Sequence, residues 1–140
     1  MNDFENYTSK LVLNEVGLGG LLHAAMIPLR GHFLAFHQGI ILQSYIKKNP
    51  KRFSFAPTKM CFIASIMKVC SIYGKKINPM VAITLQGFLF NLAIILFGVN
   101  SMGIYLGIFF LNLFPFIWPI ITSSIIFGIK LDISLILLDL

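Results

Sequence analysis

Five long apolar segments, separated by short polar or proline- and glycine-containing breaks, constrain this chain more than any other feature of its sequence. A helix needs about 20 mostly apolar residues to cross the hydrocarbon core of a bilayer. The sequence therefore predicts an all-α fold, a polytopic transmembrane bundle of five or six short or kinked helices. The apolar segments occupy residues 11–27, 32–46, 57–73, 79–97 and 103–127.

The composition supports a membrane protein and excludes several other classes. Of the 140 residues, 57% are hydrophobic and only 11% are charged, whereas an average soluble domain carries about 25% charged residues. A soluble chain of this length cannot bury so much apolar surface, and disorder, coiled coil and collagen do not fit either. We expect one integral membrane domain over residues 1–140, with the apolar end at 131–140 falling short of a final helix.

The distribution of positive charge predicts the orientation of the bundle. The net charge is +6, and the basic residues flank apolar runs, where they face phospholipid head groups; we expect a lipid bilayer as partner and no nucleic acid. Six positive charges lie on the side of the N-terminus and the 47–52 loop, against three on the other side. The positive-inside rule then places both in the cytoplasm. Nine lysines against two arginines suggest an AT-rich bacterial genome, hence a bacterial inner membrane.

Ionisable side chains within apolar segments are candidates for a binding site, because in hydrocarbon they usually face a cavity or a partner. Glu15, Gly19 and His23 follow one another at four-residue steps and share one helix face. Lys68 ends a stripe that begins at Cys61, and it is a candidate to bind a carboxylate or phosphate or to pair with Glu15. The alternatives are that Glu15 reaches the membrane interface, that His23 bonds to backbone, and that the Lys68 stem extends to the interface.

Further polar side chains complete the predicted ligand site. An amide binds a substrate while staying neutral, which suits a membrane cavity. Arg30, with His32 beside it, can hold an anion at the membrane surface. The alternatives are inter-helix hydrogen bonds for the amides and a basic interfacial turn for the arginine. The predicted ligand-binding residues are Glu15, His23, Arg30, Lys68, Gln86 and Asn112.

Small residues on two segments predict close contacts between helices, because small side chains allow helix backbones to approach in membranes. Such surfaces serve either internal packing or docking to another membrane subunit. The residues concerned are Gly19, Gly20 and Ala24 in the first segment and Gly103 and Gly107 in the fifth.

Catalytic and metal-binding motifs are absent from the sequence. It has no nucleophile elbow, HExxH, P-loop, CxxC or paired catalytic carboxylates, so we expect no enzyme, no cofactor and no metal. Cys61 and Cys70 match no zinc spacing and are expected to be buried, reduced thiols. An intramembrane enzyme that uses His23 or His32 with Glu15 as an acid–base pair stays open as an alternative.

The chain also contains several short motifs: EVGLGGLLH at 15–23, IPLRG at 27–31, APTK at 56–59, INPM at 77–80 and QG at 86–87, together with Lys68. Over residues 15–128 they resemble a family of small bacterial membrane proteins similar to the substrate-binding S components of energy-coupling-factor (ECF) transporters. The resemblance implies a compact membrane bundle of about six helices, with a small-molecule pocket that opens away from the cytoplasm. It also implies docking to a transmembrane coupling subunit driven by ATPases.

Together these features predict a membrane-embedded component that binds a small molecule of vitamin or precursor type and hands it over without covalent chemistry. The alternative function is a structural or assembly subunit of a larger membrane complex.

Overall fold

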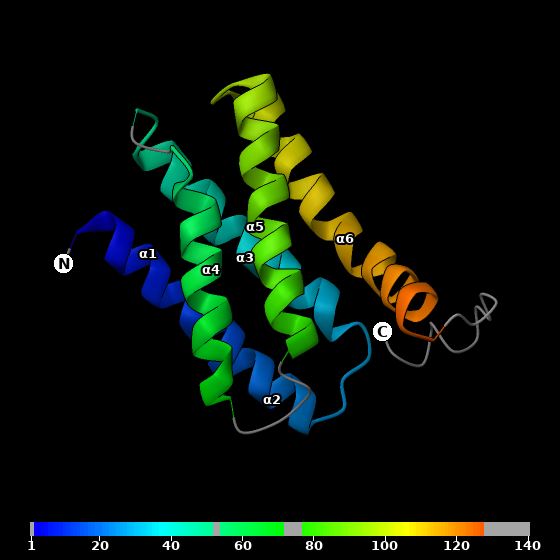
Figure 1. Cartoon of the computed structure of the whole chain (residues 1–140). Helices are drawn as coiled ribbons and strands as arrows, with labels where there is room; N and C mark the ends of the chain where they lie inside the picture. The colour runs from blue at the N-terminus through cyan, green and yellow to red at the C-terminus, as the bar shows by residue number, and fades with distance from the viewer. Residues whose placement is uncertain (1, 52–53, 72–76, 128–140) are drawn as a thin grey trace.

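The computed structural model describes residues 2–51, 54–71 and 77–127, and every regular element within these ranges is helical (Figure 1). The predicted all-α class is therefore confirmed for this part of the chain. Two helices are long and apolar enough to cross a membrane, α5 (Ile77–Phe97) and α6 (Ser101–Phe127). The predicted apolar end at 131–140 lies outside the described residues.

The N-terminal helical run begins earlier than its apolar segment and contains a wide turn. Asn2 caps the run: its side chain accepts a hydrogen bond from the Glu5 amide, and the Glu5 carboxylate accepts one from the Asn2 amide, both 3.1 Å long. This reciprocal pair satisfies two of the amides that every helix N-terminus leaves free. The run consists of α1 (Asp3–Val12), the π-helical turn η1 (Leu13–Leu18) and α2 (Gly19–Ala24).

The other helices match the predicted segments to within a few residues, except at the end of the third. That segment was expected to run to Tyr73, whereas α4 (Ala56–Met67) gives way to a 3-10 turn, η2 (Lys68–Cys70). Cys70 is exposed, contrary to the expectation that both cysteines are buried. The second segment forms α3 (Arg30–Lys48).

Two prolines inside α6 do not divide it. The sequence predicts a kink or a break at Pro115 and Pro119, and the structure has one helix across both. A proline removes one backbone donor and leaves the carbonyl four residues earlier without its helical partner. Neighbouring helices and side chains can compensate for that loss inside a bundle.

The helices are arranged around a central core (Figure 1). α4 packs against both α1 and α5, α5 packs against α6, and α3 crosses behind to contact α1 and α6. α1, α3, α4, α5 and α6 each contribute large side chains that are fully buried, so one core joins these five helices. These include Leu11, Leu42, Met60, Phe90 and Leu111.

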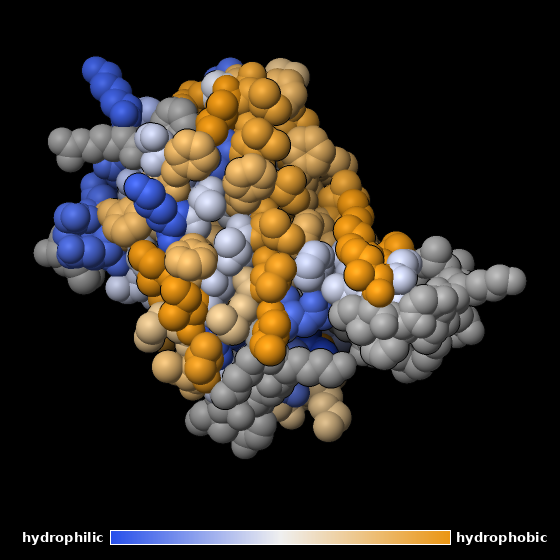
Figure 2. Space-filling view, in the orientation of Figure 1, coloured by the Kyte–Doolittle hydropathy of each residue, from blue (hydrophilic) through white to orange (hydrophobic). Residues whose placement is uncertain are grey.

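The outward faces of the helices are also apolar. Figure 2 shows hydrophobic side chains covering most of the visible surface of α5 and the first half of α6. Leu96, Tyr105 and Ile125 are each exposed over more than 60% of their area. Apolar side chains thus lie both inside and outside these helices, which is unusual for a chain that folds in water.

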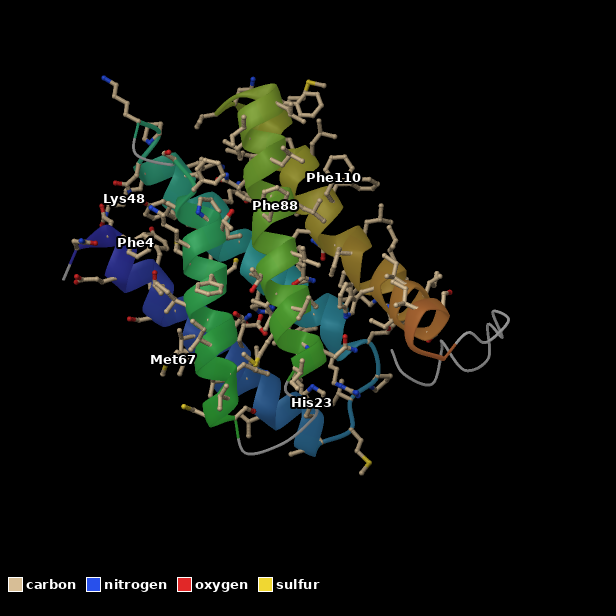
Figure 3. All side chains as sticks on the ribbon, viewed as in Figure 1. Phe4, His23, Lys48, Met67, Phe88 and Phe110 are labelled. Atoms are coloured by element: carbon tan, nitrogen blue, oxygen red, sulfur yellow. The ribbon has the colours of Figure 1, made fainter. Side chains whose placement is uncertain are left out.

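The two ends of the bundle differ in polarity. At one end, Lys48 at the close of α3 contacts Asp3 at the start of α1, with 2.7 Å between Nζ and Oδ1. The hydrogen bond from Lys48 lowers the pKa of the exposed Asp3 carboxyl. Figure 3 shows Phe4 and Lys48 at this end and His23 at the opposite end, close to the start of α5.

Gly87 sets the distance between α4 and α5. A Cβ atom at this position would collide with the Cys61 side chain and would lie 3.1 Å from the carbonyl oxygen of Pro57. The absence of a side chain therefore permits the close crossing of these two helices. The element that closely approaches Gly87 is therefore helix α4.

We expect Gly87→Ala to lower the free energy of unfolding by about 1–3 kcal/mol, because the added methyl group overpacks a rigid helix contact. Gly17→Ala is the matched control, since its Cβ would meet only Leu13 at 3.5 Å, an ordinary contact. Thermal unfolding in detergent measures both variants. Equal midpoints for the two variants would contradict this account of the α4–α5 crossing.

Candidate functional site

A cavity of about 420 Å³ lies at the end of the bundle opposite Lys48. It is enclosed by η1, α2, the start of α3, η2, the first half of α5 and the second half of α6. Figure 2 shows hydrophilic surface set back between the ends of α5 and α6 and framed by hydrophobic side chains. The polar side chains of the wall are Glu15, His23, Arg30, Lys68, Asn78, Gln86 and Thr122.

The most deeply buried charged residues of the cavity are Glu15 and Lys68, which are 3% and 2% exposed. The Lys68 ammonium donates a hydrogen bond to the backbone carbonyl oxygen of Glu15. This bond joins η2 to η1 and places a cation beside the Glu15 carboxylate. The sequence offered a ligand contact and a pairing with Glu15 as alternatives for Lys68; the structure puts the ammonium on the Glu15 backbone and both residues on the cavity wall.

The π-helical turn η1 carries two adjacent polar residues, Asn14 and Glu15, that are both buried. The Asn14 amide donates to the Glu15 carboxylate over 3.2 Å and lies 3.4 Å from the carbonyl oxygen of Leu34. Asn14 thereby holds the carboxylate and connects η1 to α3. Turns of this kind are frequent at functional sites.

Gly19 makes room for the buried ammonium. A Cβ atom there would lie 2.7 Å from Lys68 Nζ and 3.3 Å from a methyl carbon of Leu34. Glu15, Gly19 and His23 were predicted to share one helix face. Of these residues, Glu15 and His23 line the cavity, and Gly19 leaves the space that the Lys68 ammonium occupies.

Arg30 and His23 lie on the same wall and are less deeply buried than Glu15 and Lys68. Arg30 and His23 are both half-buried, and His23 lies within electrostatic reach of Arg30 and Lys68. Arg30 opens α3, whose N-cap residue Leu29 has a left-handed backbone and provides no side-chain cap. The positive end of the α3 dipole therefore adds to the charge of Arg30 at this point of the wall.

Aromatic side chains of α6 form the opposite wall. The rings of Phe114 and Trp118 stack with 5.3 Å between centroids and an angle of 23°. The Trp118 indole donates a 2.7 Å hydrogen bond to the Asn78 side chain at the start of α5. Trp118 is thus part of the cavity wall.

The structure brings five of the six predicted ligand-binding residues to this one cavity: Glu15, His23, Arg30, Lys68 and Gln86. Asn112 is not on the wall. Its side chain donates a 2.8 Å hydrogen bond to the carbonyl oxygen of Ile108 one turn earlier in α6. An amide on a helix can always find such a local acceptor, and the sequence does not distinguish this use from ligand binding.

The predicted small residues serve mainly internal contacts. A Cβ atom at Gly107 would lie 2.9 Å from the Phe90 ring, and one at Gly103 would collide with the carbonyl of Gly98 in the turn before α6. Gly20 is buried beside Ser71, whereas Ala24 is exposed at the end of α2. Internal packing, one of the two predicted uses, therefore accounts for all of these residues except Ala24.

Several polar residues of the cavity wall and the core were not selected from the sequence. Asn14 was missed because it neighbours Glu15, and Asn78 because it directly precedes Pro79 in a predicted break. Gln38 is fully buried and its amide lies 3.1 Å from the Cys61 sulfur. The spacing of Gln38 to the buried Leu42 and Tyr45 is a helical signal that would have placed it inside.

His32, the second histidine of the alternative acid–base pair, stands apart from Glu15. Its ring packs on Phe116 with 3.8 Å between centroids, and it is not part of the cavity wall. Among the residues that the structure describes, no group of three histidine, cysteine or acidic side chains is arranged to hold a metal ion.

Comparison with known protein families, curated proteins and solved structures finds no match for this chain. The resemblance to S components stays a prediction from the motifs quoted above, and the function has to be argued from the geometry of the cavity.

The pairing of Glu15 with Lys68 is testable by a double-mutant cycle of Glu15→Gln and Lys68→Met. Removing one member of a buried pair leaves the other charge uncompensated, so each single variant should lower stability. The double variant should lose less than the sum of the two, with a coupling of about 0.5–3 kcal/mol. Thermal unfolding in detergent gives the four values, and strict additivity would mean that the ammonium acts on the Glu15 backbone alone.

Proposed function

We propose that this protein is a multi-pass membrane component that binds a small molecule in the cavity and hands it over for transport, in the manner of an ECF S component. The observation that carries the proposal is the convergence of Glu15, Lys68 and Gln86 on one cavity inside an otherwise apolar body. Pockets for small molecules have this form, with mostly apolar walls and a few placed polar groups. Their volumes start at about 300 Å³, which the cavity of about 420 Å³ exceeds.

The apolar exterior supports a lipid environment. α5 and α6 have the length and composition of membrane spans, and their exposed apolar surface would favour association in water. Of the shorter helices, α4 packs against α5 and α3 against α6, while α1 packs against α3 and α4. These contacts shield part of each of these helices by protein, which a bilayer favours. We therefore place the bundle in the inner membrane of a bacterium.

The two ends of the bundle support a direction for the cavity. Lys47, Lys48 and Lys51 lie at the end where α1 begins, and the cavity lies at the other end. With the lysine-rich end in the cytoplasm by the positive-inside rule, the cavity opens on the opposite side. An uptake component needs this arrangement to receive its ligand, and delivery would then require a coupling subunit with ATPases.

The binding function is tested by native mass spectrometry of the full chain extracted in mild detergent from its host. A discrete small-molecule mass on the wild-type protein is expected. Its loss from Lys68→Leu and Gln86→Leu, by more than tenfold in occupancy, would follow from removing buried polar contacts worth about 1.5–3 kcal/mol each.

The matched control for that experiment is Lys59→Leu. It removes a lysine from α4, the helix that leads into the turn with Lys68, but not from the cavity wall. It should retain the bound mass. Stoichiometric association with other membrane subunits, without any small molecule, would instead favour the assembly role.

The orientation is tested by single cysteines introduced in a cysteine-free background. A cysteine at Lys48 should react with a membrane-impermeant maleimide only after the cytoplasmic side is opened, and one at Asn78 should react in intact cells. Reaction of both positions from the same side would contradict the proposed direction of the cavity.

A further inference from the structure

We propose that the ligand of this cavity carries one oxyanion, a carboxylate or a phosphate monoester, attached to a flat ring. In this arrangement Arg30 and the start of α3 hold the oxyanion, and the aromatic wall of α6 takes the ring. This assignment rests on the proposed binding function and gives it a substrate class.

Among the described residues of the wall, Arg30 is a cation without an ion-pair partner. The Lys68 ammonium is instead bound to the Glu15 backbone and lies within electrostatic reach of the Glu15 carboxylate. Arg30 takes part in none of the hydrogen bonds or ion pairs between described residues, although it is half-buried on the cavity wall. A guanidinium in this position offers a planar fork of donors that matches the two oxygens of a carboxylate or phosphate.

The backbone beside Arg30 favours the same kind of ligand. α3 is 19 residues long and begins without a side-chain cap. The His32 amide donates to the Leu29 carbonyl oxygen, so the amides of Arg30 and Gly31 and the positive dipole end are what the helix start offers an anion. Gly31, the second residue of the helix, lies on the cavity wall, and a Cβ built there would meet only Pro115, at an ordinary contact distance of 3.7 Å.

The other half of the cavity suits a ring. Trp118 and Phe114 form a stacked pair on the wall, and Pro115 and Pro119 extend this apolar surface between them. The hydrogen bond to Asn78 fixes the indole in place. A fixed aromatic face favours a flat partner, because stacking there costs little further ordering.

Trp118 also supplies the readout, since it is the single tryptophan of the chain. The test titrates the purified full chain, in phosphatidylcholine nanodiscs, with 4-nitrobenzoate and with 4-nitrobenzamide. Both probes carry a ring that quenches indole fluorescence, and they have nearly the same shape but differ in charge. We expect saturable quenching by both, with the carboxylate binding about tenfold more tightly because of its charge-assisted hydrogen bonds.

Arg30→Gln should remove this preference, so that the two probes bind it equally. Arg30→Lys should keep part of it, because the charge remains and the fork is lost. Lys47→Gln is the matched control, since it removes a cation from the opposite end of the same helix α3; it should keep the full tenfold preference. The unfolding midpoint of Arg30→Gln should equal that of the wild type, because Arg30 contributes no described hydrogen bond.

Three other outcomes would contradict the proposal. Saturable quenching with equal affinity for both probes would overturn the oxyanion assignment and leave the proposed binding function standing. Saturable quenching by neither probe, with no small-molecule mass in native mass spectrometry, would overturn both. A phospholipid retained by the wild type and lost from Arg30→Gln, with no preference between the probes, would assign the site to a lipid head group and overturn the ring-bearing ligand.

Discussion

The hydrogen bond from the buried Lys68 ammonium to the Glu15 backbone is the interaction on which the cavity depends. It ties the end of α4 to the π-helical turn of the first helical run, and it does so in an interior with little other polar surface. A buried ammonium requires both an acceptor and a nearby negative charge, and η1 supplies both from one residue. Gly19 follows from the same requirement, because any side chain there would occupy the space of the ammonium.

The sequence predicted the helices well and the site in outline, for different physical reasons. Helix positions follow from apolar segments and their breaks, which are local properties. Glu15, His23 and Lys68 could be assigned to one site because burying a charged group costs free energy, so such groups usually face a cavity or a partner. The π-helical turn that carries Asn14 has no periodic signature in the sequence, and the local hydrogen bond of Asn112 depends on a choice between acceptors of similar strength. The start at Asp3 was missed although Asn2 and Glu5 have the spacing of a capping box.

Polarity divides the molecule along its length as well as between inside and outside. At one end, charged groups such as Lys48 and Asp3 meet at the surface, where water screens them and their pairing contributes little to stability. At the other end, Lys68 and Glu15 meet in the interior, where screening is weak. The same residue types therefore meet at the surface at one end and line the cavity at the other.

The two prolines of α6 lie in its second half, on the cavity wall. Each proline removes one backbone hydrogen bond of the helix, so the carbonyls of Leu111 and Pro115 have no amide partner four residues ahead. The first half of the helix keeps its complete ladder and packs tightly on α5 through Gly107. The two halves of α6 consequently differ in bending stiffness, and the half that faces the cavity is the compliant one. The hydrogen bond from Trp118 to Asn78 joins this half of the helix to the start of α5 and so limits the movement of the cavity wall.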